Sequence, residues 1–149
     1  MFSELPKIIS LFSKYKVEYL IIGGYAVNLY GYPRMTEDID ILFKKGKSNG
    51  ERLESALREF GIETDIFSGQ DFSLPIHFRI GEIPNSIDLI NDTVGIDLDK
   101  IFDNANEFII EDIKLNVIPL DDLIKNKQVL NTYKDLADVE KLKAIRDKK

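Results

Sequence analysis

The stretch EDIDILF, Glu37 to Phe43, restricts the fold of this chain more than any other feature of the sequence. Side chains alternate between the two faces of an extended strand, so Asp38 and Asp40 share one face while Ile39 and Ile41 share the other. Two carboxylates are thereby held side by side. Like charges at that spacing repel each other unless a cation lies between them or water reaches them. The pattern predicts a strand with one buried apolar face and a polar face that suits a cation.

Composition excludes several classes of protein. The chain has 149 residues, of which 44% are hydrophobic and 31% charged, and we expect residues 1–149 to form a single domain. A net charge of −6 gives no general basic surface for nucleic acid. The absence of cysteine excludes disulfides, thiolate metal sites and cysteine nucleophiles, and it fits a reducing cytoplasm. Because no apolar run is long enough to span a bilayer, we expect a soluble, cytoplasmic protein without a membrane partner.

The periodicity of apolar residues predicts a mixture of helices and strands. We expect helices near residues 4–14, 25–30, 48–60, 98–105, 119–127 and 134–146. We expect strands near residues 17–22, 35–43, 63–67, 76–80 and 86–90, and a hairpin within 107–119. Ser48 and Glu51 have the spacing of a capping box that would begin the third helix. Strands in the middle and helices at both ends indicate an α+β fold whose sheet is covered on one side.

Three features of the sequence combine into one chemical hypothesis. Gly23 and Gly24 lie between a predicted strand and a predicted helix, where the lack of side chains lets backbone N–H groups approach a phosphate. Asp88 stands alone among apolar residues in SIDLI, and a carboxylate there needs a partner. If its strand lies beside that of Asp38 and Asp40, three carboxylates converge, and ligation by oxygen alone favours Mg²⁺ or Mn²⁺ over Zn²⁺. Two such ions about 3.5–4 Å apart are a common device for phosphoryl transfer.

Each feature also has an ordinary structural explanation. Two glycines after a strand commonly form only a turn, and an Asp-x-Asp pair is commonly a solvated strand end. Arg34 would then pair with Glu37 or Asp38 at the surface. Asp135 and Asp138 would lie on a solvated helix face. His77, the only histidine, would be a satisfied structural residue in an apolar strand.

The segment YLIIGGYAVNLYGYPRMTEDIDILF resembles the catalytic core of the nucleotidyltransferase superfamily, which has the DNA polymerase beta-like fold. In that family a strand runs into Gly-Gly or Gly-Ser, a helix follows, and an Asp-x-Asp lies on the next strand. The similarity is strongest to small bacterial members related to abortive-infection (AbiEii-like) toxins and to lincosamide or aminoglycoside nucleotidyltransferases. SIDLI resembles the third acidic strand, and LIKNKQVLNTYKDLADVEKL resembles the C-terminal helical segment. The resemblance implies a small mixed β-sheet with helices packed on one side and short C-terminal helices.

Carried over to this sequence, the resemblance implies a role for each matching residue. Gly23 and Gly24 would hold the β and γ phosphates of the nucleotide. Asp38, Asp40 and Asp88 would bind the metal ions and form the catalytic set, and Asp88 would also help to deprotonate the acceptor hydroxyl. The other candidates for nucleotide binding are Arg34, Thr36, Lys127 and Lys134.

The reaction that the resemblance implies is attack of an acceptor hydroxyl on the α-phosphate of a nucleoside triphosphate, with release of pyrophosphate and dependence on Mg²⁺ or Mn²⁺. The acceptor stays open among a small molecule, a protein and a tRNA end, as do the preferred base and the oligomeric state. We expect no extra acceptor-holding domain after the core, so recognition of the acceptor would come from the C-terminal helices, from an oligomer partner, or not at all. The alternative is a catalytically degenerate nucleotide-binding protein or one component of a toxin–antitoxin pair, acting with a protein partner or as a homodimer.

Overall fold

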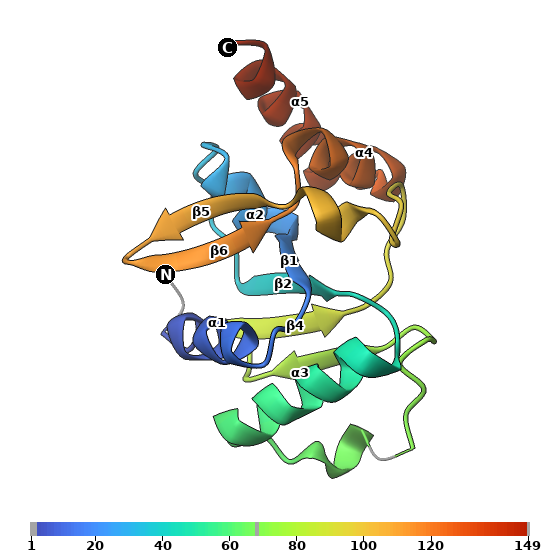
Figure 1. Ribbon diagram of the computed structural model, residues 1–149. Coiled ribbons are helices and arrows are strands. Elements are labelled where there is room, and N and C mark those ends of the chain that lie inside the picture. The colour runs from blue at the N-terminus through green and yellow to red at the C-terminus, as the bar shows by residue number, and fades with distance from the viewer. Residues whose placement is uncertain (1–2, 68, 149) are drawn as a thin grey trace.

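A computed structural model describes residues 3–67 and 69–148 of the chain (Figure 1). The strands are β1 Tyr19–Ile22, β2 Asp38–Phe43, β3 His77–Ile80, β4 Ser86–Ile90, β5 Asn106–Ile110 and β6 Ile113–Val117. The helices are α1 Leu5–Lys14, α2 Gly23–Leu29, α3 Lys47–Phe60, α4 Leu120–Leu130 and α5 Tyr133–Asp147, with 3₁₀ helices η1 Thr64–Phe67 and η2 Ile101–Asn104. The strands form one mixed sheet in the order β3-β4-β2-β1-β6-β5, which confirms the α+β fold class.

One face of the sheet is apolar and is covered by helices. Strand β2 pairs antiparallel with β1, so Tyr19 and Phe43 are neighbours on the same face as Ile39 and Ile41. Phe12 of α1 packs on Tyr19 with ring centroids 5.3 Å apart, and α1 and α3 pack against each other beside the sheet (Figure 1). Ile39 and Ile41 are fully buried. Burial of this face fixes which face of β2 its aspartates occupy.

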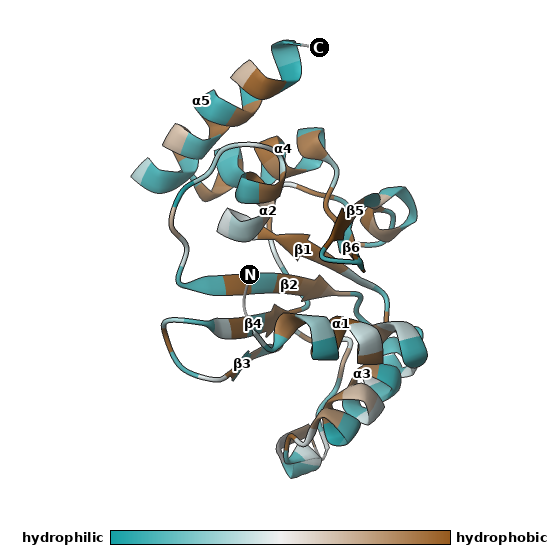
Figure 2. Cartoon of the chain, turned by 90° about the vertical axis from the view of Figure 1, so that its left-hand side faces the viewer, coloured by the Kyte–Doolittle hydropathy of each residue, from teal (hydrophilic) through white to brown (hydrophobic). Residues whose placement is uncertain are grey.

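The opposite face of β2 begins with polar residues, and the hydropathy colouring in Figure 2 shows the change from a hydrophilic start to a hydrophobic end of this strand. Helices α4 and α5 pack against each other at the other end of the molecule from α1 and α3 (Figure 2). No helix in the part of the chain that the structure describes is long and apolar enough to cross a membrane.

Two of the expected elements differ from the structure. Residues 63–67 were predicted as a strand, but Thr64–Phe67 forms the 3₁₀ helix η1. A run this short cannot be assigned from its period alone. Phe67 instead packs on Phe72 and Phe78, with ring centroids 5.9 and 5.3 Å away. The helix expected near residues 98–105 is likewise reduced to the short 3₁₀ helix η2.

The predicted capping box was wrong, and the real one lies elsewhere. Helix α3 begins at Lys47, one residue before Ser48, and no side chain caps its start. The hydroxyl of Ser48 instead accepts a hydrogen bond from Arg52 at 2.6 Å. The capping box that the structure contains joins Thr132 and Asp135 at the start of α5, where the oxygen of Thr132 accepts from the backbone N–H of Asp135 at 3.1 Å.

Candidate active site

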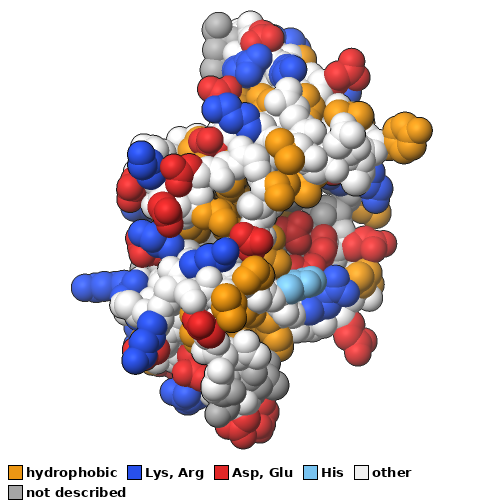
Figure 3. Space-filling view, turned by 90° about the vertical axis from the view of Figure 1, so that its right-hand side faces the viewer, with side chains coloured by type: hydrophobic (Ala, Val, Ile, Leu, Met, Phe, Trp, Pro, Cys, Tyr) orange, Lys and Arg blue, Asp and Glu red, His pale blue; other side chains and the backbone are white. Residues whose placement is uncertain are grey.

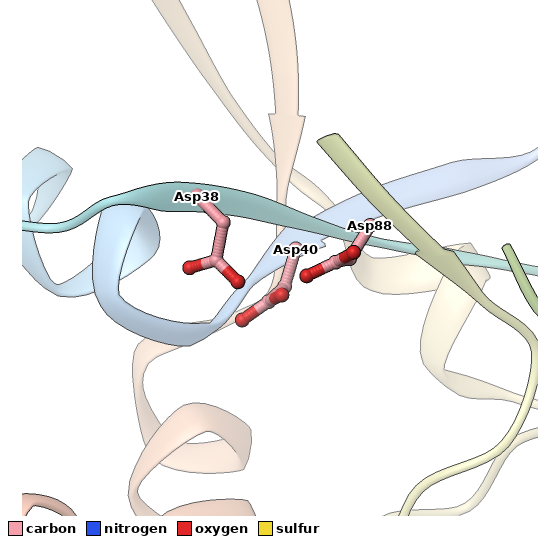
Figure 4. Close-up of side chains that lie close together, drawn as sticks. All are labelled: Asp38, Asp40 and Asp88. Atoms are coloured by element: carbon pink, nitrogen blue, oxygen red, sulfur yellow. The ribbon is translucent and has the colours of Figure 1, made fainter. Parts of the chain in front are cut away.

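Three carboxylates from two neighbouring strands meet on the polar face of the sheet. Strands β2 and β4 run parallel, and Asp40 is the register partner of Asp88. Asp38 lies two residues before Asp40, so all three side chains project from the same face (Figure 4). One oxygen from each carboxylate lies within 4.8 Å of the other two. We call these three residues the acidic cluster; the structure brings them together, and their role as metal ligands stays a prediction.

The acidic cluster lies in a pocket of about 660 Å³. Figure 3 shows acidic side chains gathered in a hollow on one side of the molecule. Every residue that the sequence singled out for the site lines this pocket: Gly23, Gly24, Arg34, Thr36, Asp38, Asp40, Asp88, Lys127 and Lys134. Strands β1, β2 and β4 and the α4–α5 pair thus bring these site residues, from Gly23 to Lys134, to one pocket.

The acidic cluster carries more negative charge than its surroundings balance. Burial, a hydrogen bond shared with Asp88 and the charges of Asp40 and Asp88 raise the pKa of Asp38 to about 6. Burial and then the charge of Asp88 raise the pKa of Asp40, although Lys127 partly opposes this. Because these carboxyls resist losing their protons together, a bound cation would stabilise the cluster.

Asp88 differs from its neighbours because strand β3 supplies it with cationic partners. Arg79 is its register partner, and the guanidinium donates from Nε to Oδ1 at 2.8 Å and from Nη2 to Oδ2 at 3.2 Å. Nε2 of His77 lies 3.4 Å from Oδ1. Burial alone would raise the pKa of Asp88, but hydrogen bonds from Arg79, Asp38 and His77 outweigh it and lower that pKa. Asp88 is therefore held ionised.

Arg79 was not among the predicted site residues. The His77 side chain is 60% exposed and is not enclosed by the apolar residues around it in the sequence, but Asp88 provides it with a partner. The two residues lie two positions apart on β3 and share the face of Asp88 in the β3–β4 hairpin. Alternation in HFRI could have revealed this face once the hairpin register was known.

Charged and polar side chains lie directly against the turn formed by Gly23 and Gly24, so a side chain added at either position would force a neighbour to move. Gly23 has φ of 68°, a conformation that side chains rarely adopt, and an added Cβ would overlap Oδ2 of Asp40. A Cβ on Gly24 would lie 2.9 Å from Nη2 of Arg34 and 3.1 Å from Oγ1 of Thr36. The glycine turn, Asp40 and Arg34 therefore form one compact group.

A second charged cluster lies beside the first and is fully paired. Arg34 donates to Asp138 from Nε and Nη2, each at 2.8 Å. Nζ of Lys127 lies 3.0 Å from Oδ1 of Asp135 and 3.0 Å from Oδ2 of Asp138. We call these four residues the ion-pair network. The expectations that Arg34 pairs with a nearby acidic residue, and that Asp135 and Asp138 lie on a solvated face, were wrong, because packing of α5 on α4 buries both aspartates.

The remaining two candidates lie at the rim of the pocket. The hydroxyl of Thr36 donates to the backbone oxygen of Asp38 at 3.0 Å, so it supports the start of β2. Lys134 is exposed at the start of α5 and lines the pocket. An exposed lysine can turn toward an anionic ligand at little cost.

The residues of the acidic cluster fit a divalent cation such as Mg²⁺ or Mn²⁺. All three donors are carboxylate oxygens, which these ions prefer. The buried hydroxyl of Ser86 belongs to the register partner of Asp38 and has no hydrogen-bond partner among the residues that the structure describes. A divalent ion would supply the positive charge that the acidic cluster lacks.

Known structures with the same fold include antibiotic-modifying enzymes. The lincosamide antibiotic adenylyltransferase LnuA, with lincomycin bound, is 19% identical, with 97% of this chain and 98% of that chain covered and a TM-score of 0.56. ANT(2'')-Ia in complex with adenylyl-2''-tobramycin is 13% identical, with 98% and 94% covered and a TM-score of 0.50. A Thermotoga maritima protein described as a putative nucleotidyltransferase is 17% identical, with 96% and 88% covered and a TM-score of 0.56. These identities support the fold alone.

Sequence comparison identifies the family. No curated protein sequence matches the chain. The profile of the aminoglycoside-2''-adenylyltransferase family matches residues 4–80, which is more than half of the 149 residues and includes the glycine turn and both aspartates of β2. The chain therefore belongs to the aminoglycoside-2''-adenylyltransferase family and is a nucleotidyltransferase.

Proposed function

We propose that this chain is a metal-dependent nucleotidyltransferase that moves a nucleoside monophosphate from a nucleoside triphosphate to a hydroxyl of a small molecule, with release of pyrophosphate. The observation that carries the proposal is the meeting of Asp38, Asp40 and Asp88 in a pocket that also contains the glycine turn. The lincomycin and adenylyl-2''-tobramycin in two related folds support a small hydroxyl-bearing acceptor.

In this proposal the acidic cluster would hold Mg²⁺ or Mn²⁺, which when bound would neutralise phosphate charge and align the reactants. Gly23 and Gly24 would let the chain approach the phosphates closely, since neither residue carries a side chain of its own. Four polar side chains would donate hydrogen bonds or positive charge to the triphosphate: Arg34, Thr36, Lys127 and Lys134.

The proposed reaction joins the acceptor oxygen to the α-phosphorus and breaks the bond from that phosphorus to the bridging oxygen of pyrophosphate. The acceptor hydroxyl loses its proton as the new bond forms. Asp88 would accept that proton or orient the hydroxyl, because Arg79 keeps its carboxylate ionised. The protein contributes mainly positioning and electrostatics in such a transfer.

Two further points belong to the proposal. We propose that residues 1–149 act as one domain, which is supported by a hydrophobic core that includes buried residues from α1 through α5. A cytoplasmic location would suit a chain without cysteine, in a compartment that supplies nucleoside triphosphates.

Calorimetric titration of ATP, GTP, CTP and UTP tests the proposal, with and without Mg²⁺, on the wild type and Asp40→Asn. We expect metal-dependent binding of at least one triphosphate that Asp40→Asn weakens strongly, while the exposed control Asp103→Asn binds like the wild type. Release of pyrophosphate upon addition of a lincosamide or an aminoglycoside would then support a small acceptor. Absence of binding to all four triphosphates would refute the proposal and direct attention to a protein partner.

A further inference from the structure

The carboxylate of Asp138 joins two cations that come from distant parts of the chain. Its two oxygens accept hydrogen bonds from Nε and Nη2 of Arg34, which lies just before β2, and Oδ2 also lies 3.0 Å from Nζ of Lys127 on α4. The Asp138 side chain is only 2% exposed, and it lies outside the set of described residues that line the pocket. Asp138 therefore holds both cations from a buried position outside the pocket lining.

Each cation retains donors after these bonds are counted. A guanidinium has five N–H groups, and among the described residues Arg34 directs two at Asp138 and one at the backbone oxygen of Met35, 3.2 Å from Nη1. The ammonium of Lys127 has three N–H groups and directs two of them at Asp135 and Asp138. Both residues line the pocket, so the unused donors are available to a ligand there.

One unused donor of Arg34 lies beside the glycine turn. Nη2 gives one of its two N–H groups to Asp138 and is also the atom that a Cβ on Gly24 would approach to 2.9 Å, which places it against the turn. Because Asp138 holds the Nε–Nη2 edge of the guanidinium through two bonds, the plane of the group is fixed, and the second N–H of Nη2 is left for a ligand. A guanidinium fixed in this way loses less side-chain entropy when it binds a phosphate.

We propose that Asp138 is a positioning residue for the triphosphate, because it fixes Arg34 and Lys127 so that their free donors face the phosphates at the glycine turn. The inference rests on the proposed function, since it assumes that the pocket binds a triphosphate. Helix α5 would then contribute to nucleotide binding through Asp138. Asp138 would affect the affinity only through Arg34 and Lys127.

The test measures dissociation constants in Mg²⁺ for whichever of ATP, GTP, CTP and UTP the wild type binds best. Asp138→Asn keeps the shape of the side chain but removes the charge, and we expect the dissociation constant to rise about tenfold to hundredfold. With Arg34→Ala already present, the same change should have a smaller effect, because one of the two cations through which Asp138 acts is gone. Asp138→Glu keeps the charge and protects folding but moves the carboxylate by one methylene, so it should weaken binding by less than Asn.

Val139 provides a matched control on the same helix. It is buried and adjacent to Asp138 but makes no part of the ion-pair network. We expect Val139→Ala to lower the melting temperature and leave the dissociation constant unchanged. Equal weakening by Val139→Ala and Asp138→Asn, or full additivity of Asp138→Asn with Arg34→Ala, would overturn the inference and leave Asp138 a purely structural residue. Failure of the wild type to bind any triphosphate would instead overturn the proposed function.

Discussion

The acidic cluster and the ion-pair network face the same pocket but are built in opposite ways. The acidic cluster sets three carboxylates against one firmly bonded cation, Arg79, whose side chain is 43% exposed. The ion-pair network balances two cations with two carboxylates and buries three of the four side chains almost fully. The acidic cluster is left with an excess of negative charge, whereas the charges of the ion-pair network balance one another.

The difference indicates what each cluster does. Buried charges that find partners within the protein support the fold, and their loss leaves the partner uncompensated. Charges that repel one another reduce stability, and they persist at positions where a ligand supplies the opposite charge. We therefore expect mutations in the acidic cluster to lower activity without lowering stability, and mutations in the ion-pair network to lower stability as well as nucleotide affinity, and the following predictions test that separation.

The largest effect is expected from Asp40→Asn, measured as pyrophosphate release with saturating triphosphate and acceptor. Loss of one carboxylate of the proposed metal site should lower kcat by at least about a hundredfold to a thousandfold. The free energy of unfolding of the metal-free protein should be unchanged or higher at neutral pH, because burial and Asp88 raise the pKa of Asp40 and its charge opposes folding. Unfolding of this variant under conditions where the wild type is folded would contradict the separation.

Lys127→Met should have the largest effect on stability. It leaves Asp135 and Asp138 buried without their shared ammonium, which is expected to cost about 3–5 kcal/mol in the free energy of unfolding. Urea denaturation followed by circular dichroism measures this. The exposed Lys134 on α5 provides the control, since Lys134→Met should change stability little. Equal stability of the two variants would show that the ion-pair network does not support the fold.

Gly23→Ala should disturb the acidic cluster through the backbone. The positive φ of Gly23 and the overlap of an added Cβ with Asp40 should together lower stability by about 1–3 kcal/mol and reduce activity as well. Gly61 also has positive φ, at 108°, but nothing lies within 4 Å of its added Cβ. Gly61→Ala should therefore lower stability without reducing activity, and a loss of activity in both variants would contradict a specific role for the Gly23 turn.

The smallest effect is expected from pH. The pKa of Asp38 rises from 3.8 to about 6 in the folded protein, so the protonated form favours folding. This contribution is complete below about pH 4 and is lost as the pH rises through about 6. In EDTA, the free energy of unfolding of the wild type should fall by about 1–2 kcal/mol relative to that of Asp38→Asn over that pH range, a value that allows for solvent screening. Parallel stability curves for the two proteins, measured by urea denaturation, would show that Asp38 is not perturbed.

The sequence was sufficient to predict the acidic cluster because its geometry depends on local alternation. Asp38 and Asp40 share a face in any strand, and Asp88 joins them once β4 lies beside β2. The apolar stripe of α1 and the hairpin of β5 and β6 were predicted on the same basis. These features need only the period of the chain and one pairing of strands.

The ion-pair network could not be predicted because it depends on packing between distant elements. Arg34 and Asp138 meet only when α5 folds back over the segment before β2, and no local pattern records that contact. The spacing of Asp135 and Asp138 on a helix is equally compatible with a solvated face. The same limit explains η1, where contacts of Phe67 with Phe72 and Phe78 outweigh a short run of strand-like residues.

The acidic cluster forms only when β2 and β4 pair in a register that keeps Asp88 on the same face as Asp38 and Asp40. A slip of one residue between these strands would turn Asp88 toward the face covered by α1 and α3 and bring an isoleucine or a leucine to the side of Asp40. A sheet with this one-residue slip does not retain three carboxylates on one face. A chain that folds with that register would therefore lack the acidic cluster altogether, although its strands would still be paired.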